Sequence, residues 1–591
     1  MAATTVATRV AEEIGYKLGE EVGYSIRFED LTSAKTRIKF LTDGLLLREA
    51  LADPLLSRYS VIMIDEAHER SLSTDILLGV LKKIRKRRPD LRIVVSSATL
   101  QAEDFLRFFS GEEDEKNSDG VENTVGNIIS LEGRIYPVDT LFLEEPAGDY
   151  VERAVKTIFD IHASEPDGDI LLFLTGREEI DTALQMIADR AETLHPRAQT
   201  ILSLPLYAGL TSEQQLYVFE PAPENTRKVI VSTNIAEASV TIDGIVYVID
   251  CGFVKLRTFN PKTGIETLTA IPVSKASAMQ RAGRAGRTKP GKCYRLYTQS
   301  AYETMSEATI PEIQRSNLAP IILQLKALGI DNVLRFDFLT PPPAELIICS
   351  LELLYSLGAV DDYAKLTRPL GVRMAELSVE PMMAKVLLSA PTMGCLPEIL
   401  SIAAMTSLQG TVWFHHDGEK KATDTSRRKF AVEEGDHLTL LNVYQTFVTK
   451  GRKDSKWCRD NFLNYKSMTR AVSIRAQLKR YLERFGINVD ESLAARRPDE
   501  MSSKGEQIRK CLTAGYFAHA ARMQPDGTFK TVNGGVTLHA HPSSLMFNRK
   551  ADWVIFHEIL ETGNKTFIRD VTKIEKSWLL DGSLSIYYQI K

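Results

Sequence analysis

The sequence predicts a chain that begins with two α/β lobes and continues through helices into a small β-barrel. Up to about residue 312, short apolar runs typical of buried strands alternate with stretches of helical periodicity. After that point the period becomes helical and is interrupted by Pro341-Pro342-Pro343. From about residue 505, apolar and polar residues alternate between glycine turns at Gly527 and Gly534-Gly535, which favours a small barrel.

Length and composition are compatible with this plan but do not select it. A chain of 591 residues predicts about four domains, and 44% hydrophobic with 25% charged residues is typical of globular proteins. The net charge of −4 argues mildly against a nucleic-acid-binding protein, although basic residues can line an internal channel. Six cysteines without a CxxC pair predict a reducing compartment and no zinc site. We find no signal peptide and no membrane-spanning run, so no membrane partner is expected.

The most informative segment is VIMIDEAHER, residues 61–70. Its apolar run predicts a central strand of a parallel sheet, covered on both faces, with Asp65 and Glu66 emerging at the carboxyl end where ligands bind. Asp65, with Glu66 beside it, suits Mg²⁺, and Glu66 also suits orienting or deprotonating a water. His68 follows them. The alternative is an acidic pair that only complements a helix dipole.

Ordered motifs on both sides of this segment favour the catalytic interpretation. They are Thr42-Asp43-Gly44 (upstream of it), Ser97-Ala98-Thr99, Thr175-Gly176, STNIAEASVTIDG at 232–244 and QRAGRAGR at 280–287. Their order and wording resemble the DEAH-box helicases, which are superfamily 2 RNA-dependent NTPases. The wording RKFAVEEGDHLTLLN at 428–442 is most similar to the DEAH-box helicase thirty-five subgroup.

The resemblance implies a domain for each region of the chain. The expected domains are a partial RecA-like lobe at 1–137, a second RecA-like lobe at 138–312, a winged helix at 313–390, a ratchet-like helical bundle at 391–504 and an OB-fold at 505–591.

The same resemblance implies the nucleotide-handling residues. Arg284 and Arg287 lie three apart, one helical turn, so both are expected to face the γ-phosphate, where a charged planar fork binds well. Gln280 would help to position the attacking water, and Ser97 and Thr99 would couple hydrolysis to movement. Arg281 is interpreted as structural.

Base and ribose contacts are also implied. Arg9 and Phe219 would sandwich the purine, which reads no base edge and predicts broad NTP use. Asp243 would contact the ribose. The alternatives are a core aromatic for Phe219 and an ordinary turn residue for Asp243.

RNA is expected to be held through its backbone rather than its bases. The expected contacts are Thr42, Thr175, Gly176, Thr233 and Asn234, with Arg27 and Arg134 as basic additions. Residues 254–270 predict a hairpin with its turn at 260–264, including Lys262, which the family uses as a wedge. The cluster KKIRKRR at 82–88 is interpreted as the solvated end of a helix.

A phosphate-binding loop, GxxxxGK[ST], is absent from these residues. The nearest match, GRTKPGKC at 286–293, has Cys293 at the hydroxyl position and is expected to form a turn between helix and strand. The front of the first lobe is therefore expected to be missing. Either the chain is a truncated form of an active helicase, which the retained acids and arginines favour, or its catalytic lobe has been dismantled.

The resulting hypothesis is an ATP- and Mg²⁺-dependent RNA helicase that translocates 3′-to-5′ on single-stranded RNA. The resemblance implies remodelling of RNA or RNP in pre-mRNA splicing, a nuclear location, spliceosomal proteins or a G-patch activator as partners, and a monomer. The rival hypothesis is a catalytically inactive protein that binds RNA or a partner.

Overall fold

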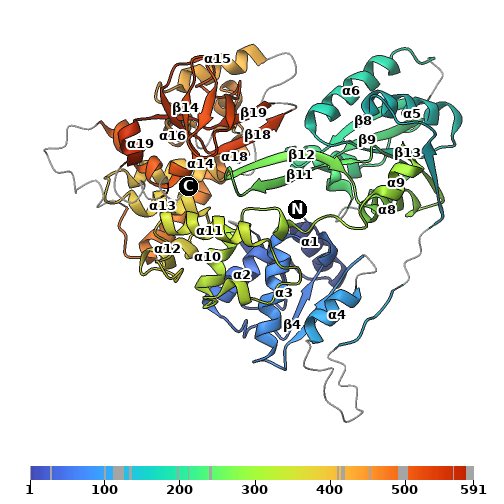
Figure 1. Cartoon of the computed structure of the whole chain (residues 1–591). Coiled ribbons are helices and arrows are strands. Elements are labelled where there is room, and N and C mark those ends of the chain that lie inside the picture. The colour runs from blue at the N-terminus through green and yellow to red at the C-terminus, as the bar shows by residue number, and fades with distance from the viewer. Residues whose placement is uncertain are drawn as a thin grey trace, which may run out of the picture.

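The structure is a computed structural model. It describes the residues 2–26, 29–98, 102–110, 126–131, 136–195, 199–210, 212–237, 242–408, 412–413, 420–451, 454–489, 503–562, 565–580 and 587. Lobe 1, drawn in blue, lies at the base of Figure 1, and lobe 2, in teal, lies apart from it at the upper right. The yellow-to-red elements of the C-terminal half lie on the left, and a long green hairpin spans the space between them and lobe 2.

Lobe 1 is an α/β unit with two small sheets. Strand β1 pairs with β2 antiparallel and with β3 parallel, while β4 pairs only with β5, in parallel, among the described residues. Its elements are α1 (Ala2–Ile14), β1 (Val22–Ile26), β2 (Glu29–Leu31), β3 (Ile38–Leu41), α2 (Asp43–Ala52), β4 (Val61–Ile64), η1 (Ala67–Glu69), α3 (Leu72–Arg85), β5 (Arg92–Val95) and α4 (Ala102–Ser110).

The expectation that β4 is covered on both faces is wrong. Ile62 and Ile64 are buried, whereas Val61 is 55% and Met63 60% exposed, and their neighbour Val94 on β5 is 44% exposed. One face packs into the core that includes α3, and no element in the described part of the chain covers the other. An apolar run indicates that a strand tends to be buried, but it does not show which element covers each face of that strand.

Lobe 2 is the predicted second α/β lobe. Its six strands are all parallel, in the order β6-β13-β10-β7-β9-β8, and separate hydrophobic clusters cover the two faces. Its elements are β6 (Val138–Leu143), α5 (Tyr150–Ser164), β7 (Asp169–Phe173), α6 (Arg177–Ala191), β8 (Thr200–Leu206), α7 (Ser212–Leu216), η3 (Tyr217–Phe219), β9 (Thr226–Ser232), η4 (Asn234–Ala236), β10 (Ile245–Asp250), α8 (Lys275–Gly283), η5 (Arg284–Gly286), β13 (Gly291–Thr298) and α9 (Gln299–Thr304).

The hairpin predicted within lobe 2 is present. Strands β11 (Phe253–Asn260) and β12 (Ile265–Pro272) pair antiparallel around a turn closed by the N–H of Gly264 on the carbonyl of Asn260. Strand β12 packs against β18 of the C-terminal barrel. At the hairpin tip, a Cβ on Gly534 of the barrel would lie 3.0 Å from Cα of Thr263, so glycine permits this close approach.

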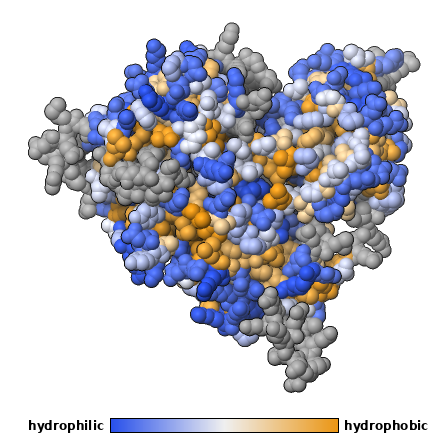
Figure 2. Space-filling model, viewed as in Figure 1, coloured by the Kyte–Doolittle hydropathy of each residue, from blue (hydrophilic) through white to orange (hydrophobic). Residues whose placement is uncertain are grey.

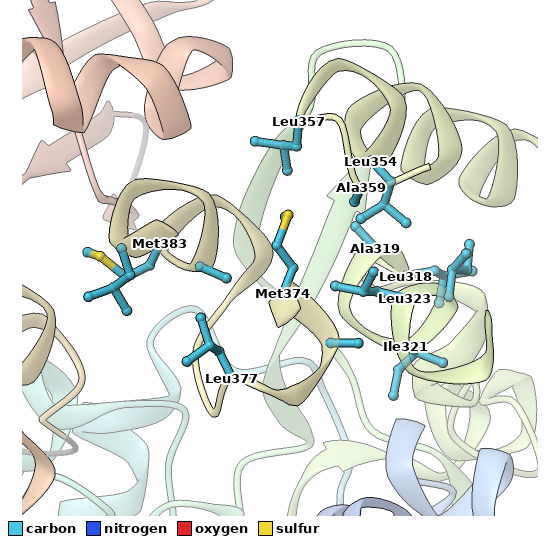
Figure 3. Packing of buried hydrophobic residues seen from close by; sticks show 14 of the residues in the cluster. Leu318, Ala319, Ile321, Leu323, Leu354, Leu357, Ala359, Met374, Leu377 and Met383 are labelled. Carbon is cyan, nitrogen blue, oxygen red and sulfur yellow. The ribbon is translucent and has the colours of Figure 1, made fainter. Parts of the chain in front are cut away.

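The helical region joins lobe 1 to the barrel through one continuous core. This core runs from α2 and α3 through α10–α13 into α14, α18 and α19. Figure 3 shows Leu323, Leu354 and Met374 converging within it. The helices are η6 (Glu312–Gln314), α10 (Ala319–Ala327), η7 (Val333–Arg335), α11 (Ala344–Ser356), α12 (Leu370–Glu376), α13 (Pro381–Ser389), α14 (Leu396–Thr406), α15 (Lys420–Phe430), α16 (Asp436–Thr446), η8 (Phe447–Gly451), α17 (Ser455–Asp460), α18 (Tyr465–Arg484) and α19 (Lys504–Tyr516).

The C-terminal barrel is built on a seven-stranded sheet in the order β18-β19-β16-β15-β14-β17-β20. The elements are η10 (Phe517–His519), β14 (Ala520–Met523), β15 (Phe529–Thr531), β16 (Thr537–Ala540), β17 (Trp553–Ile555), β18 (Glu558–Thr562), β19 (Lys565–Arg569), β20 (Thr572–Ile574) and η11 (Lys576–Leu580). The bundle is fastened to it by Asp436, whose carboxylate accepts hydrogen bonds from the Ser544 hydroxyl at 2.5 Å and from the N–H groups of Leu545 and Val571, each at 2.8 Å.

The surface is mixed, with hydrophobic residues gathered along the middle of the face in Figure 2 and hydrophilic residues on its rims.

All six cysteines are buried as free thiols. Among the described helices, none is long and apolar enough to cross a bilayer.

Candidate active site

The two carboxylates of lobe 1 sit on a sharp turn at the end of β4. Glu66 adopts a left-handed backbone conformation, with φ of 51°, and its N–H donates to Oδ1 of Asp65 at 3.0 Å. The next N–H, of Ala67, donates to the carbonyl of Ser96 at 3.0 Å. The turn is thereby tied to the chain that leaves β5, and both carboxylates remain accessible to solvent.

His68 connects this turn to the Ser97-Ala98-Thr99 motif. Its Nδ1 accepts the N–H of Ala98 at 3.2 Å, and its Nε2 lies 3.5 Å from Oε2 of Glu66. Burial lowers the pKa of His68 despite the nearby Glu66 and Asp65, which favours the neutral ring. With Nδ1 acting as an acceptor, the remaining ring proton is on Nε2 and faces the Glu66 carboxylate. A movement of the segment after β5 would therefore move His68 and change its contact with Glu66.

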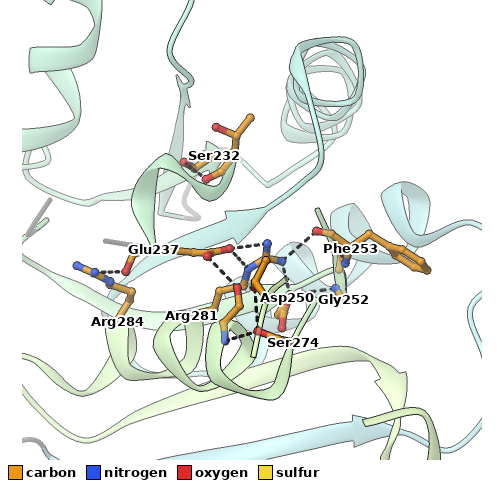
Figure 4. A network of polar contacts seen from close by, with 12 residues as sticks. Ser232, Glu237, Asp250, Gly252, Phe253, Ser274, Arg281 and Arg284 are labelled. Carbon is orange, nitrogen blue, oxygen red and sulfur yellow. Dashed lines mark hydrogen bonds and ion pairs between the residues drawn. The ribbon is translucent and has the colours of Figure 1, made fainter. Parts of the chain in front are cut away.

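In lobe 2, a buried arginine anchors the QRAGRAGR helix. The Arg281 guanidinium lies 2.6 Å from Oε1 of Glu237 and 2.7 Å from Oδ1 of Asp250, and it is 0% exposed (Figure 4). Glu237 also accepts the Ser277 hydroxyl at 2.8 Å, and Asp250 accepts the Tyr297 hydroxyl at 2.9 Å. Arg281 is thus structural, as interpreted from the sequence.

Sequence reasoning missed Glu237 and Asp250. Asp250 ends the buried strand β10, and Glu237 follows the almost fully buried strand β9 by five residues. A carboxylate there requires a buried cationic partner, and Arg281 on the neighbouring motif could have been matched to it.

Arg284 follows directly, at the start of the η5 turn after α8 ends at Gly283. Its Nη2 donates to the carbonyl of Glu237. Burial lowers the pKa of Arg284 to about 10, and the charge of Arg287 adds to this while Glu66 and Glu237 oppose it. Arg284 therefore lies within electrostatic reach of both Arg287 and Glu66 of the other lobe. Arg284 and Arg287 therefore sit on a 3-10 turn, which is tighter than the α-helical turn that was expected. Arg287 is exposed.

At the junction between the two lobes, Gln280 belongs to lobe 2 and Ser97 to lobe 1. Both side chains are partly buried. The pKa of Glu69 is raised to about 7, first by loss of water around it and then by Glu66, Asp43 and Glu237. Glu312, which follows lobe 2, fixes the junction by accepting the N–H of Leu72 at the start of α3 at 2.7 Å.

The predicted base-binding residues are exposed. Arg9 on α1 is paired with Glu13 at 2.6 Å, with a 74% exposed side chain, and Phe219 on η3 is 39% exposed. Exposure argues against a core role for Phe219. Asp243 is exposed in the turn before Gly244, whose φ is +90°. Their roles in binding base and ribose stay predictions.

The predicted RNA-binding residues differ in accessibility. Thr42 and Asn234 are exposed at element starts, and Thr233 is half-buried. Thr175, in contrast, is 6% exposed; it lies between the end of β7 and the start of α6, and its N–H donates to Oε2 of Glu179 at 3.0 Å. The expectation that its hydroxyl is presented to phosphate is therefore not met in this structure.

The β11–β12 hairpin adds two lysines to the candidate RNA contacts. Lys262 is exposed in the turn, where its N–H donates to Oδ1 of Asn260 at 3.0 Å. Lys255, which sequence reasoning missed, lies beside Gly176, since a Cβ on that glycine would be 3.1 Å from Lys255 Nζ. Thr99, Arg27 and Arg134 fall outside the described residues.

The near match to a phosphate-binding loop, residues 286–293, runs from the end of η5 into the start of β13, and so forms the turn between helix and strand that was expected. Strand β13 begins at Gly291, where a Cβ would lie 2.5 Å from two carbonyl oxygens, and Cys293 is fully buried in the sheet. Lys292 pairs with Glu165 at 2.7 Å. The basic cluster at 82–88 likewise closes α3, and the Arg88 guanidinium donates to the carbonyls of Leu56 and Tyr59.

Comparison with known proteins agrees with this arrangement. Residues 152–289 match the helicase conserved C-terminal domain, 350–379 the winged-helix and 380–440 the ratchet-like part of the helicase-associated domain HA2, and 508–585 the oligonucleotide/oligosaccharide-binding fold.

Full-length relatives show the same similarity. The chain is 51% identical over 595 residues to the human "Probable ATP-dependent RNA helicase DHX35", covering all of this chain and 82% of that protein. The protein of the same name from Pongo abelii is 51% identical, with 80% of it covered. A Caenorhabditis elegans homologue is 49% identical over 588 residues, covering 98% of this chain and 77% of that protein.

Proposed function

Because the chain belongs to the DEAH-box family of ATP-dependent RNA helicases, most like DHX35, we propose that it couples ATP hydrolysis to 3′-to-5′ movement along single-stranded RNA. The observation that carries this proposal is the setting of the two charged motifs: Glu66 ends β4 with His68 between it and the Ser97 motif, and Arg284 of lobe 2 is fixed by its hydrogen bond to the Glu237 carbonyl. A catalytic acid and a cationic finger from different lobes provide what hydrolysis at a lobe junction requires.

The donor set of lobe 1 fits Mg²⁺. Asp65 and Glu66 present carboxylate oxygens at the carboxyl end of β4, and magnesium prefers oxygen ligands. When bound with a nucleotide, Mg²⁺ neutralises charge on the phosphate oxygens. Glu66 would then accept the proton of the attacking water, and Arg284 would face developing negative charge. Arg9, Phe219 and Asp243 remain the proposed contacts to base and ribose.

The site would transmit its state through His68. Because His68 contacts both Glu66 and the N–H of Ala98, a change at Glu66 would be passed to Ala98 and the neighbouring Ser97. The hairpin, Asn234 and the backbone of Gly176 would hold the strand through phosphates and riboses. We further propose a monomer that remodels RNA or RNP in nuclear pre-mRNA splicing, with spliceosomal proteins or a G-patch protein as partners and a broad use of NTPs.

A second candidate function is RNA binding without hydrolysis. It is favoured by one observation, that the 591 residues contain no GxxxxGK[ST] segment to cradle the phosphates.

A single experiment separates the two candidates. RNA-stimulated ATP turnover by the 591-residue protein, abolished in Glu66→Gln, supports the helicase. RNA binding with background turnover in both proteins supports the second candidate. Unwinding of duplexes with a 5′ overhang but not a 3′ overhang would contradict the direction of movement.

A further inference from the structure

A cavity lies between the helical bundle and the barrel, away from the lobe junction. It has a volume of about 560 Å³ and is lined by Ala431, Glu433, Arg549, Lys550 and Lys573. The first two residues belong to the loop between α15 and α16, Arg549 and Lys550 to the loop between β16 and β17, and Lys573 to β20.

The charge of this cavity is positive. Three cations face one carboxylate, and the pairing is weak, since Lys573 Nζ lies 3.7 Å from Oε1 of Glu433, whose side chain is 83% exposed. Arg549 and Lys550 are both exposed, and within the described ranges neither side chain forms a hydrogen bond or ion pair. Such cations attract an anion without first having to break a salt bridge.

Hydrogen bonds to the helical bundle and within the loop hold the loop that carries Arg549 and Lys550. The hydroxyl of Ser544 and the N–H of Leu545 both donate to buried Asp436 of the bundle, and the N–H of Arg549 donates to the carbonyl of Met546 at 3.1 Å. Two residues before Arg549 in the same loop, Phe547 is 43% exposed. The loop therefore presents an aromatic ring and two adjacent cations on a fixed support.

The cavity is separate from the contact that the hairpin makes with the barrel. Strand β12 packs against β18, which is at one end of the strand order, whereas Lys573 is on β20 at the other end. Figure 1 shows the hairpin reaching the barrel from the side of lobe 2.

We propose that Arg549, Lys550 and Lys573, here called the basic notch, bind phosphates of single-stranded RNA beyond the hairpin, with Phe547 stacking on a base. The combination of an exposed aromatic with adjacent cations fits nucleic acid better than an acidic peptide, which offers charge but no base to stack. The proposal rests on the RNA binding proposed above and adds a second contact to it.

The test is RNA binding by the full 591-residue protein across a salt series, with labelled poly-uridylate as the probe. Each phosphate contributes about −0.7 to the slope of log affinity against log salt, so Arg549→Gln/Lys550→Gln should make the slope shallower by about 1.4. Phe547→Ala should weaken binding at least about fivefold, the lower end of one lost base stack.

The matched control is Lys86→Gln/Arg87→Gln, which removes two adjacent exposed cations from lobe 1. It should leave the slope close to that of the wild type. All three variants alter exposed side chains, and thermal unfolding checks that each is folded.

Two results would overturn the inference alone: wild-type RNA binding with a notch variant no different from the control, or displacement of the strand from the notch by poly-glutamate as readily as by RNA. If the wild-type protein binds no RNA at all, the proposed function fails and the notch proposal fails with it.

Discussion

Arg284 is the residue whose role is most sharply defined by its position. It is half-buried, it donates to the Glu237 carbonyl, and it lies within electrostatic reach of Glu66 across the lobe junction. If it stabilises charge in the transition state, Arg284→Ala should lower kcat by about 10³ or more in the RNA-stimulated ATPase of a chain extended to include a GxxxxGK[ST] loop. Arg284→Lys should not restore the rate, because an ammonium lacks the planar fork. A change confined to KM would assign the arginine to ground-state binding.

Arg281 has a different expectation, because it is fully buried between Glu237 and Asp250. Arg281→Ala leaves two buried carboxylates without their cation, which should lower the free energy of unfolding by about 3–5 kcal/mol. The control is Arg177→Ala, which breaks a pair 3.3 Å long between side chains that are 57% and 53% exposed, and should cost at most about 1 kcal/mol. Urea denaturation of each protein measures the difference, and equal losses would disprove the buried role.

At the scale of elements, three neutral histidines contact Tyr516 at the end of α19: His437 on α16, His519 on η10 and His557 just after β17. Burial lowers the pKa of His437 to about 3, and the pKa values of His519 and His557 to about 4. Since these groups titrate near 6.5 when unfolded, the unfolded chain binds more protons below that pH, and stability falls as the pH drops from about 6.5 to about 4. Asp570 and Glu69, whose pKa values burial raises to about 7, act in the opposite direction, while His541, whose pKa burial lowers to about 4, acts with the three histidines.

His557→Phe tests this dependence. Removing one of the titrating histidines should make the urea midpoint less sensitive to pH between 6.5 and 4 than in the wild type. His195→Gln, at an exposed position, should leave the sensitivity unchanged. An unaltered pH profile in His557→Phe would show that acid acts elsewhere.

The sequence motifs predicted the residues of the candidate site better than they predicted which side chains and elements pack around it. Glu66 lies at the carboxyl end of β4, where the strand-end argument puts it, whereas Arg284 lies on the η5 turn after a helix and was predicted only by the resemblance of its motif. The exposed face of Val61 and Met63 could not be foreseen, because an apolar run does not reveal which layer covers it. The partners of Arg281 were missed for the same kind of reason, since pairing depends on which strands become neighbours.

For the whole molecule, the contact between hairpin tip and barrel links lobe 2 to the C-terminal half. Gly534 has φ of +75° and packs against Thr263, so Gly534→Ala introduces both backbone strain and a clash. Gly527→Ala is the matched control, with φ of +84° and open space around it. We expect Gly534→Ala to reduce RNA unwinding more than ATP turnover, while Gly527→Ala affects neither. Equal effects of the two substitutions would mean that strain alone is responsible.

The single carboxylate of Asp436 also has a consequence for hydrogen exchange. The amides of Leu545 and Val571 come from separate parts of the barrel, yet both donate to this one side chain of the bundle. Neither proton can exchange with deuterium through this bond until bundle and barrel separate, so the two amides should exchange at the same rate and lose protection together in Asp436→Asn. They therefore act as paired reporters of whether the C-terminal half opens as one cooperative unit.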